Sequence, residues 1–141
     1  MSVFTPREIE YLWGQPLGRL ATVGAAGGPH VVPVSFRHNA ELGTIDVDGH
    51  NLSRSKKFRD VAQNDRAAFV VDDVVPPWRA RGIEVRGRAE ALAEGGRQVN
   101  AGFDSELIRI TPTRVVAWGI DTNAYRPNSR AVGAPKGSGA P

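Results

Sequence analysis

Short apolar runs of strand length, separated by Gly, Pro, Asn and Asp, follow one another along most of the chain. They cover residues 19–23, 30–37, 43–50, 66–73, 81–94 and 105–121. The last stretch is expected to be two short strands that turn at Pro112. Strands that are nearly continuous in sequence favour an antiparallel barrel or sandwich over a parallel βαβ sheet. The chain is therefore expected to be mainly β, with six or seven strands.

Two short helices complete the pattern. Thr5 can cap a helix that begins at Pro6, and Glu8 stands where it closes a capping box. Gly14 is expected to end this helix. A second helix is expected over 53–64, where apolar residues recur at one-face spacing behind two serines. Helices are thus few and short.

Proline and glycine mark the places where strands are interrupted. Pro33 inside 30–37 indicates an edge, a bulge or a place that something other than a strand approaches. The stretch "GAAGG" at 24–28 is interpreted as a hairpin turn, because a strand rather than a helix follows it. Gly87 is expected to mark a bend in the long strand that contains it.

The length and composition fit one soluble globular domain. The chain has 141 residues, of which 40% are hydrophobic and 23% charged. A split-barrel domain is expected over residues 1–121. Residues 122–141 are rich in Pro, Gly, Ser and Ala and have little to bury, so they are expected to form a flexible C-terminal tail.

The charge is unevenly distributed along the chain. The formal net charge is +3, and Arg126, Arg130 and Lys136 in the expected tail account for all of it. The other 15 Lys and Arg residues balance the 15 Asp and Glu residues. A neutral body argues against nucleic acid as a partner, because nucleic-acid binding uses a broad basic face. A local basic cluster suggests a small anionic ligand instead.

Several kinds of site are disfavoured. The chain has no cysteine, which excludes disulfides and thiolate metal sites and fits a cytoplasmic protein. His30, His38 and His50 stand apart from one another, so no metal site is expected. We expect neither a signal peptide nor a membrane-spanning helix. No nucleophile elbow, P-loop or dinucleotide fingerprint occurs, and no catalytic residue is assigned.

The segment "NLSRSKKFRD" gathers three cations in four positions at the expected start of the second helix. Arg54, Lys56 and Lys57 lie where the helix dipole is positive, which disfavours each exposed cation by about 0.3–1 kcal/mol. The first-turn amides and the hydroxyls of Ser53 and Ser55 would be further donors to an anion. The residues alone leave two interpretations open: an anion site, or a solvated helix start whose lysines point outward.

The order of four segments resembles a known family. The segments "VVPVSF", "SRSKKFRDVAQND", "GIEVRGRAEAL" and the closing hairpin "IRITPTRVVAWGID" follow one another as in the flavin-binding split-barrel proteins of the pyridoxamine-phosphate-oxidase-like superfamily. Ser55 and Lys57 match a Ser-x-Lys pair of this superfamily, whereas Asn64-Asp65 replaces its usual Asn-Pro. The last segment is similar to the actinobacterial branch that uses the deazaflavin coenzyme F420. The resemblance covers residues 5 to about 123.

This resemblance implies a homodimer of two split barrels with the cofactor in the groove between them. The cofactor-binding residues that it implies are Pro33, Val34, Ser35, Phe36, Asn51, Arg54, Ser55, Lys56, Lys57, Trp78 and Arg79. The first four would line the cofactor ring, and the basic cluster would hold the phosphate and the acidic tail. Trp78 and Arg79 would reach across from the partner subunit.

The activity implied by the resemblance is hydride transfer from F420H2 to a small unsaturated organic substrate. An FMN-dependent oxidoreductase of the same fold and a non-enzymatic F420- or flavin-binding protein are the alternatives. F420 is preferred to FMN because it carries a phosphodiester and a polyglutamate tail, which suits the cluster cations together with Arg126 and Arg130. The fold alone specifies no substrate.

Overall fold

The structure, a computed structural model, describes residues 2–133. Its helical elements are α1 (Pro6–Trp13), the 3-10 turn η1 (Leu52–Arg54), α2 (Lys56–Gln63) and α3 (Gly96–Val99). Its strands are β1 (Gly18–Val23), β2 (Pro29–Asn39), β3 (Thr44–Asp48), β4 (Arg66–Val75), β5 (Arg79–Leu92), β6 (Leu107–Trp118) and β7 (Asn128–Ala131). Strands therefore dominate, as the apolar runs predicted.

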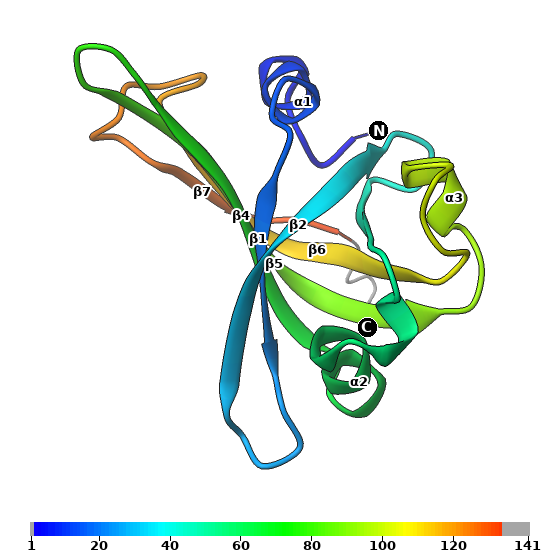
Figure 1. Cartoon of the computed structure of the whole chain (residues 1–141). Coiled ribbons are helices and arrows are strands. Elements are labelled where there is room, and N and C mark those ends of the chain that lie inside the picture. The colour runs from blue at the N-terminus through cyan, green and yellow to red at the C-terminus, as the bar shows by residue number, and fades with distance from the viewer. Residues whose placement is uncertain (1, 134–141) are drawn as a thin grey trace.

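Six antiparallel strands close into a barrel (Figure 1). Their order is β3-β2-β1-β4-β5-β6, and the pairing of β3 with β6 closes the ring. The seventh strand, β7, adds to the same edge of β6 further along: β3 pairs with residues 108–110 and β7 with residues 114–117. The prediction of a mainly β, antiparallel barrel with few short helices is confirmed.

The strand β2 divides its length between two neighbours, which explains the proline within it. Residues 29–34 pair with β1, and residues 35–39 pair with β3. Pro33 lies opposite Arg19 of β1, before the pairing with β3 begins. Pro33 therefore occupies an edge, where a missing N–H breaks no ladder on the open side.

The prediction of two short strands that turn at Pro112 is wrong, because the single strand β6 covers both. It runs unbroken over 107–118 beside β5. The register shifts at Gly87, which faces Pro112 and leaves Thr113 as the extra residue of a bulge. A Cβ atom on Gly87 would collide with the carbonyl of Thr111. The bulge thus accommodates the proline without ending the strand, and Gly87 marks the predicted bend.

Residues 128–131 correct the prediction that a flexible tail begins at residue 122. They form β7 on the edge of β6. Arg130 of this strand forms an ion pair with Glu8 of α1, whose side chain has no exposed surface. Composition could not reveal this strand, because its buried partner lies 122 positions away. The end of the expected tail, residues 134–141, lies outside the described residues.

Alternate residues of the strands fill the interior of the barrel. Leu20 on β1, Phe69 and Val71 on β4, and Ile83 and Val85 on β5 are all buried. Full burial of a side chain of this size contributes about 1.5–3 kcal/mol. This core fixes the strand ends that carry the candidate site.

The hairpin between β4 and β5 extends beyond the barrel, and the loop that follows β6 lies beside it (Figure 1). We call these two segments, residues 74–80 and 119–127, the arm. The helix α1 lies on the same side of the barrel as the arm, whereas α2 lies at the opposite end. The molecule therefore has two separate ends on which ligand-binding residues can gather.

Candidate functional site

The turn before α2 positions the basic cluster, which is Arg54, Lys56 and Lys57. Asn51 takes a left-handed backbone conformation, with a φ angle of 55°, where the chain leaves β3 and enters η1. Asn is one of the few residue types that adopt this conformation readily. Leu52 is fully buried and anchors η1 to the core. The cluster is thus attached to the barrel by the residues immediately before it.

Of the two serines at the expected start of the second helix, Ser55 is the N-cap of α2. Its hydroxyl donates to the carbonyl of Leu52 at 2.6 Å and accepts the N–H of Phe58 at 3.3 Å. Because a hydroxyl has one proton to donate, Ser55 in this arrangement has none left for an anion. The amides of Lys56 and Lys57, in the first turn of α2, have no acceptor within the helix.

Lys56 is held by the protein itself. Its Nζ lies 3.0 Å from Oδ1 of Asp60, one turn further along α2, and Asp60 also accepts the hydroxyl of Thr22 at 2.9 Å. Burial alone would raise the pKa of Asp60, but the hydrogen bonds from Lys56 and Thr22 outweigh it and lower the pKa. One of the three cluster charges is therefore compensated within α2, and the bond from Thr22 to Asp60 fastens this helix to β1.

Arg54 and Lys57 are the two cluster cations without a carboxylate partner. Within residues 2–133 no salt bridge includes either of them. Lys57 is half-buried, and burial lowers the pKa of its amino group. An arriving anion would compensate this desolvated charge. Lys57 is thus the residue of the cluster with the most to gain from a negatively charged ligand.

Residues 33–36 of β2 lie beside this turn, because Ser35 pairs with the last residue of β3. Their side chains alternate between the two faces of the strand. Val34 is buried, and the ring of Phe36 packs edge-on against another core ring at 5.0 Å. Pro33 and Ser35 point to the outer face. A ligand outside the barrel would meet Pro33, Ser35 and the backbone of this segment.

Trp78 and Arg79 lie on the arm, far from α2 (Figure 1). Within one chain, Asn51 and the basic cluster lie in one turn, and residues 33–36 are linked to that turn through the pairing of Ser35 with Asp48. The same chain does not bring Trp78 and Arg79 to them.

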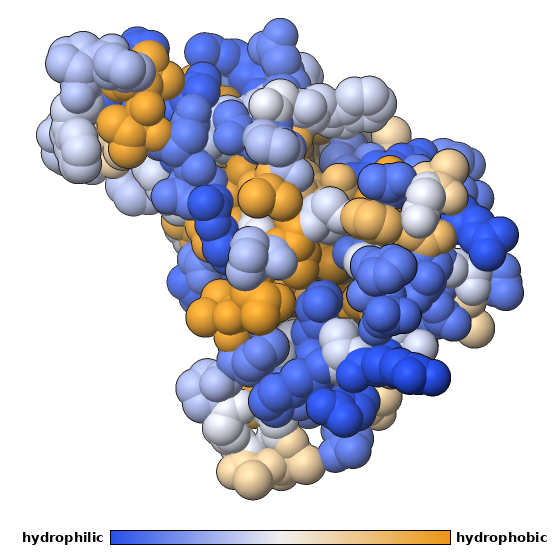
Figure 2. Space-filling model, in the orientation of Figure 1, coloured by the Kyte–Doolittle hydropathy of each residue, from blue (hydrophilic) through white to orange (hydrophobic). Residues whose placement is uncertain are grey.

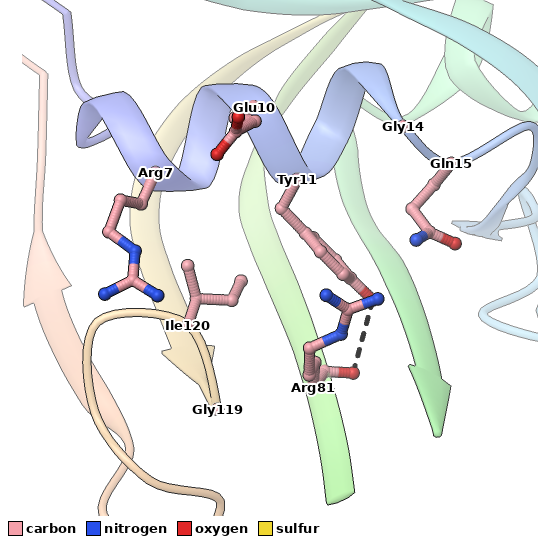
Figure 3. Close-up of a pocket in the computed structure, with 8 residues that line it drawn as sticks. All are labelled: Arg7, Glu10, Tyr11, Gly14, Gln15, Arg81, Gly119 and Ile120. Carbon is pink, nitrogen blue, oxygen red and sulfur yellow. Dashed lines mark hydrogen bonds between the residues drawn. The ribbon is translucent and has the colours of Figure 1, made fainter. Parts of the chain in front are cut away.

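A cavity of about 280 Å³ lies between α1 and the base of the arm (Figure 3). The hydroxyl of Tyr11 donates to Asp73 at 2.8 Å, and Arg81 donates to the same carboxylate at 3.0 and 2.7 Å. The guanidinium of Arg81 lies 4.9 Å from the centre of the Tyr11 ring. Burial, and then the bond to Asp73, raises the pKa of Tyr11, so the phenol stays protonated. These three side chains satisfy one another, and two of them, Tyr11 and Arg81, line the cavity.

Neither this network nor the bond between Thr22 and Asp60 was predicted from the sequence. Tyr11 and Asp73 are 62 positions apart, so no local pattern connects them. The pair of Asp73 and Arg81 had a signal in the sequence, because a hairpin centred on Pro76 and Pro77 places these two residues opposite each other.

Residues 2–133 contain neither a cluster of metal-ligating side chains nor a helix that could span a membrane. No three His, Cys, Asp or Glu side chains there lie close enough together to hold a metal ion. None of the helices described is both long and apolar enough to cross a membrane.

Known proteins match the sequence of this chain over most of its length. The model of the pyridoxamine 5'-phosphate oxidase family matches residues 5–119. A 5a,11a-dehydrotetracycline/5a,11a-dehydrooxytetracycline reductase from Streptomyces rimosus is 53% identical over 120 residues, which is 84% of each protein. This relative and the family match confirm the prediction of an oxidoreductase.

Solved structures share the fold at lower identity. A conserved hypothetical protein from Mycobacterium tuberculosis has a TM-score of 0.66 and 20% identity, covering 84% of this chain and 86% of that one. An FAD binding protein from Mycobacterium smegmatis has a TM-score of 0.61 and 19% identity, covering 83% and 96%. The match over residues 5–119, together with the barrel itself, shows that this chain belongs to the pyridoxamine 5'-phosphate oxidase family.

Proposed function

We propose that the protein is a reductase that uses the reduced deazaflavin coenzyme F420 to transfer a hydride to an unsaturated, fused-ring organic molecule. The observation that carries this proposal is the 53% identity to the Streptomyces rimosus reductase over 84% of the chain. The name of that enzyme describes the reduction of a dehydrotetracycline, a molecule built of fused rings. The coenzyme comes from the resemblance of residues 5 to about 123 to the F420-dependent branch.

The residues present fit an acidic cofactor. Lys57 is a half-buried cation without a carboxylate partner in residues 2–133, and Arg54 is exposed beside it. In the proposal these two side chains and the first amides of α2 hold the phosphate and the acidic tail. Asn51, Ser55 and Lys56 shape the turn, and residues 33–36 lie along the ring. When bound, a reduced deazaflavin supplies a hydride.

The chain's own contribution is orientation and the exclusion of water, and no catalytic residue is proposed. Residues 33–36 offer backbone groups and the outward side chains of Pro33 and Ser35. The inward packing of Val34 and Phe36 makes this part of β2 rigid. A rigid strand holds a bound ring in one orientation, which favours hydride transfer to one face of a substrate.

The proposal includes a homodimer, because one chain leaves Trp78 and Arg79 far from the basic cluster. The outward residues of β1, β2 and β4 supply an apolar face for a second copy. Val31 is 65% and Val74 44% exposed, and Ala21, Val23 and Val70 lie partly exposed on the same face. Apolar residues also reach the surface near the centre of Figure 2. A second copy packed there would bring the arm of one subunit toward the basic cluster of the other.

FMN is the second candidate cofactor, and one observation favours it. The preference for F420 counted Arg130 among the cations available to a long acidic tail. Arg130 instead pairs with the buried carboxylate of Glu8, and Lys56 pairs with Asp60. Of the five cations counted for F420, Arg54, Lys57 and Arg126 have no carboxylate partner within residues 2–133, and Arg126 lies on the arm. The two that remain in the basic cluster suit a single phosphate as well as a longer anion.

A titration of the purified protein with F420 and, separately, with FMN tests the proposal. Absorbance and fluorescence of the cofactor report binding. Submicromolar binding of F420 with weaker binding of FMN is expected. Tight binding of FMN and none of F420 would refute F420 as the cofactor and support FMN. Binding of neither would refute a cofactor site in this protein.

Lys57→Ala is the first testable substitution in the proposed site. Loss of one charge-assisted contact, worth about 1.5–3 kcal/mol, should raise the dissociation constant for the cofactor ten-fold or more. Arg97→Ala is the matched control, because Arg97 is an exposed cation on α3 and outside the proposed site. Equal affinity of the Lys57 variant and the parent protein would remove Lys57 from the site.

A further inference from the structure

A larger cavity, of about 530 Å³, lies on the arm. We call it the arm cavity. Its walls are the tip of the β4–β5 hairpin, the loop 119–125 and Arg7 of α1. It shares Arg7, Arg81, Gly119 and Ile120 with the smaller cavity of Figure 3, so the two cavities are adjacent. A volume of this size is ordinary for a small-molecule site, for which about 300–1,000 Å³ is typical.

The loop wall of the arm cavity is fixed in place. Gly119 has a φ of 70°, and a Cβ atom there would collide with the carbonyl of Ala80 across the hairpin. Only glycine allows the chain to turn this closely against the hairpin. The hydroxyl of Thr5 also donates to Asp121 at 2.6 Å, which ties the loop to the cap of α1. The cavity is therefore formed before any ligand arrives.

Two aromatic side chains stand on the rim of the arm cavity. Trp78 on the hairpin is 73% exposed, and Tyr125 on the loop is 87% exposed. A single exposed aromatic residue needs no explanation, but two from different segments that line one cavity leave two flat apolar faces in water. Flat faces of this kind bind planar rings by stacking.

The lining carries an excess of positive charge. Within residues 2–133, no salt bridge includes Arg7 or Arg79. Arg81 is already occupied by Asp73. Asp121 is the one acidic residue among the lining residues, and the hydroxyl of Thr5 is bonded to it. Two free guanidinium groups favour a ligand with acidic or enolate oxygens, which they can bind in pairs of hydrogen bonds.

We propose that the arm cavity binds the ring system of an anionic, fused-ring substrate. Trp78 and Tyr125 stack on the rings, and Arg7 and Arg79 pair with the acidic substituents. This inference rests on the proposed function, in which the arm of one copy meets the cofactor held by the other. It assigns the substrate to the arm, whereas the basic cluster holds the cofactor.

Isothermal titration calorimetry of the full-length protein without cofactor tests the inference. The probe is anthraquinone-2-sulfonate, a planar three-ring anion, and benzenesulfonate is the single-ring control. We expect Trp78→Ala and Tyr125→Ala each to weaken binding of the probe by about five- to ten-fold, as lost stacking predicts. Arg79→Gln should weaken it and reduce its dependence on salt. Trp13→Ala is the matched control, because Trp13 is 71% exposed but lies outside the arm cavity.

Three results would overturn the inference: no binding of the probe at millimolar concentration, equal binding of benzenesulfonate, or an equal loss in the Trp13 variant. A failure of the proposed function looks different. If the probe binds as expected but neither F420 nor FMN does, the arm cavity stands and the reductase proposal falls. If a cofactor binds through Lys57 but the probe does not bind, only the arm cavity is refuted.

Discussion

The imidazole of His38 lies inside the barrel, and among residues 2–133 neither of its ring nitrogens has a hydrogen-bond partner. Its ring meets Phe4 edge-on at 5.3 Å. Burial, and then the nearby charge of Arg37, lowers the pKa of His38 below its usual 6.5. The unfolded chain therefore takes up this proton at a higher pH than the folded protein. The free energy of unfolding should fall as the pH drops below about 6.5.

His38→Leu should remove that part of the pH dependence, because the side chain no longer titrates. Urea unfolding at pH 7.5 and pH 5.5 measures the difference for the parent protein and the variant. His50→Gln is the control and should keep the parent's pH dependence, since His50 is exposed. An unchanged difference in the His38 variant would show that another group is responsible.

Local rules predicted the roles of residues whose partners are near in the sequence. They did not predict contacts between residues that are far apart in the sequence. The capping box of Thr5 and Glu8 forms as predicted, because all its members lie within four positions. Ser55 caps α2 for the same reason. The i,i+4 spacing of Lys56 and Asp60 also allows their ion pair to be predicted, but the bond from Thr22, which is 38 positions from Asp60, has no local signal. The pairing of Arg130 with Glu8, 122 positions away, is likewise beyond local rules.

At the scale of elements, β7 is held by an ion pair with α1. Glu8 has no exposed surface, and Arg130 keeps about a quarter of its own, with Nη1 3.1 Å from Oε2 of Glu8. Arg130→Gln should lower the free energy of unfolding by about 2–4 kcal/mol, because it leaves a buried carboxylate without its partner. The double variant Glu8→Gln/Arg130→Gln should recover part of the loss, since no charge is then left unpaired.

Chemical denaturation of the two single variants and the double variant completes this cycle. Arg126→Gln, an exposed position in the same segment, should change stability by less than about 0.5 kcal/mol. Additive effects of the two single substitutions would mean that Glu8 and Arg130 do not stabilise the fold through each other.

The strands were predictable where their own residues specify them. The apolar runs of β1, β3, β4 and β5 predict these strands because each buries one face or both. The sequence "NSRA" of β7 has no such pattern, and it pairs because β6 offers a free edge beyond β3. Pro112 suggested a break, and only the register against Gly87 makes it compatible with a continuous strand.

At the scale of the whole molecule, the proposed dimer predicts the effect of a charge on the apolar face. Val31→Lys should convert the dimer into a monomer and weaken cofactor binding, because a lysine on an apolar contact must be desolvated. Sedimentation velocity at micromolar concentration measures the association state. Leu42→Lys is the control, since Leu42 is 57% exposed but lies in the turn between β2 and β3. A parent protein that sediments as a monomer would refute the dimer.

The arm stands outside the barrel, and its rim side chains contribute nothing to the core. Substitutions at Trp78, Arg79 or Tyr125 should therefore change stability by less than about 0.5 kcal/mol, as at other exposed positions. A protein engineer could randomise these three codons and still recover folded variants from most of the library. Because the arm is separate from the core, substitutions that change which ring-shaped acceptor binds can also accumulate there during evolution without unfolding the barrel.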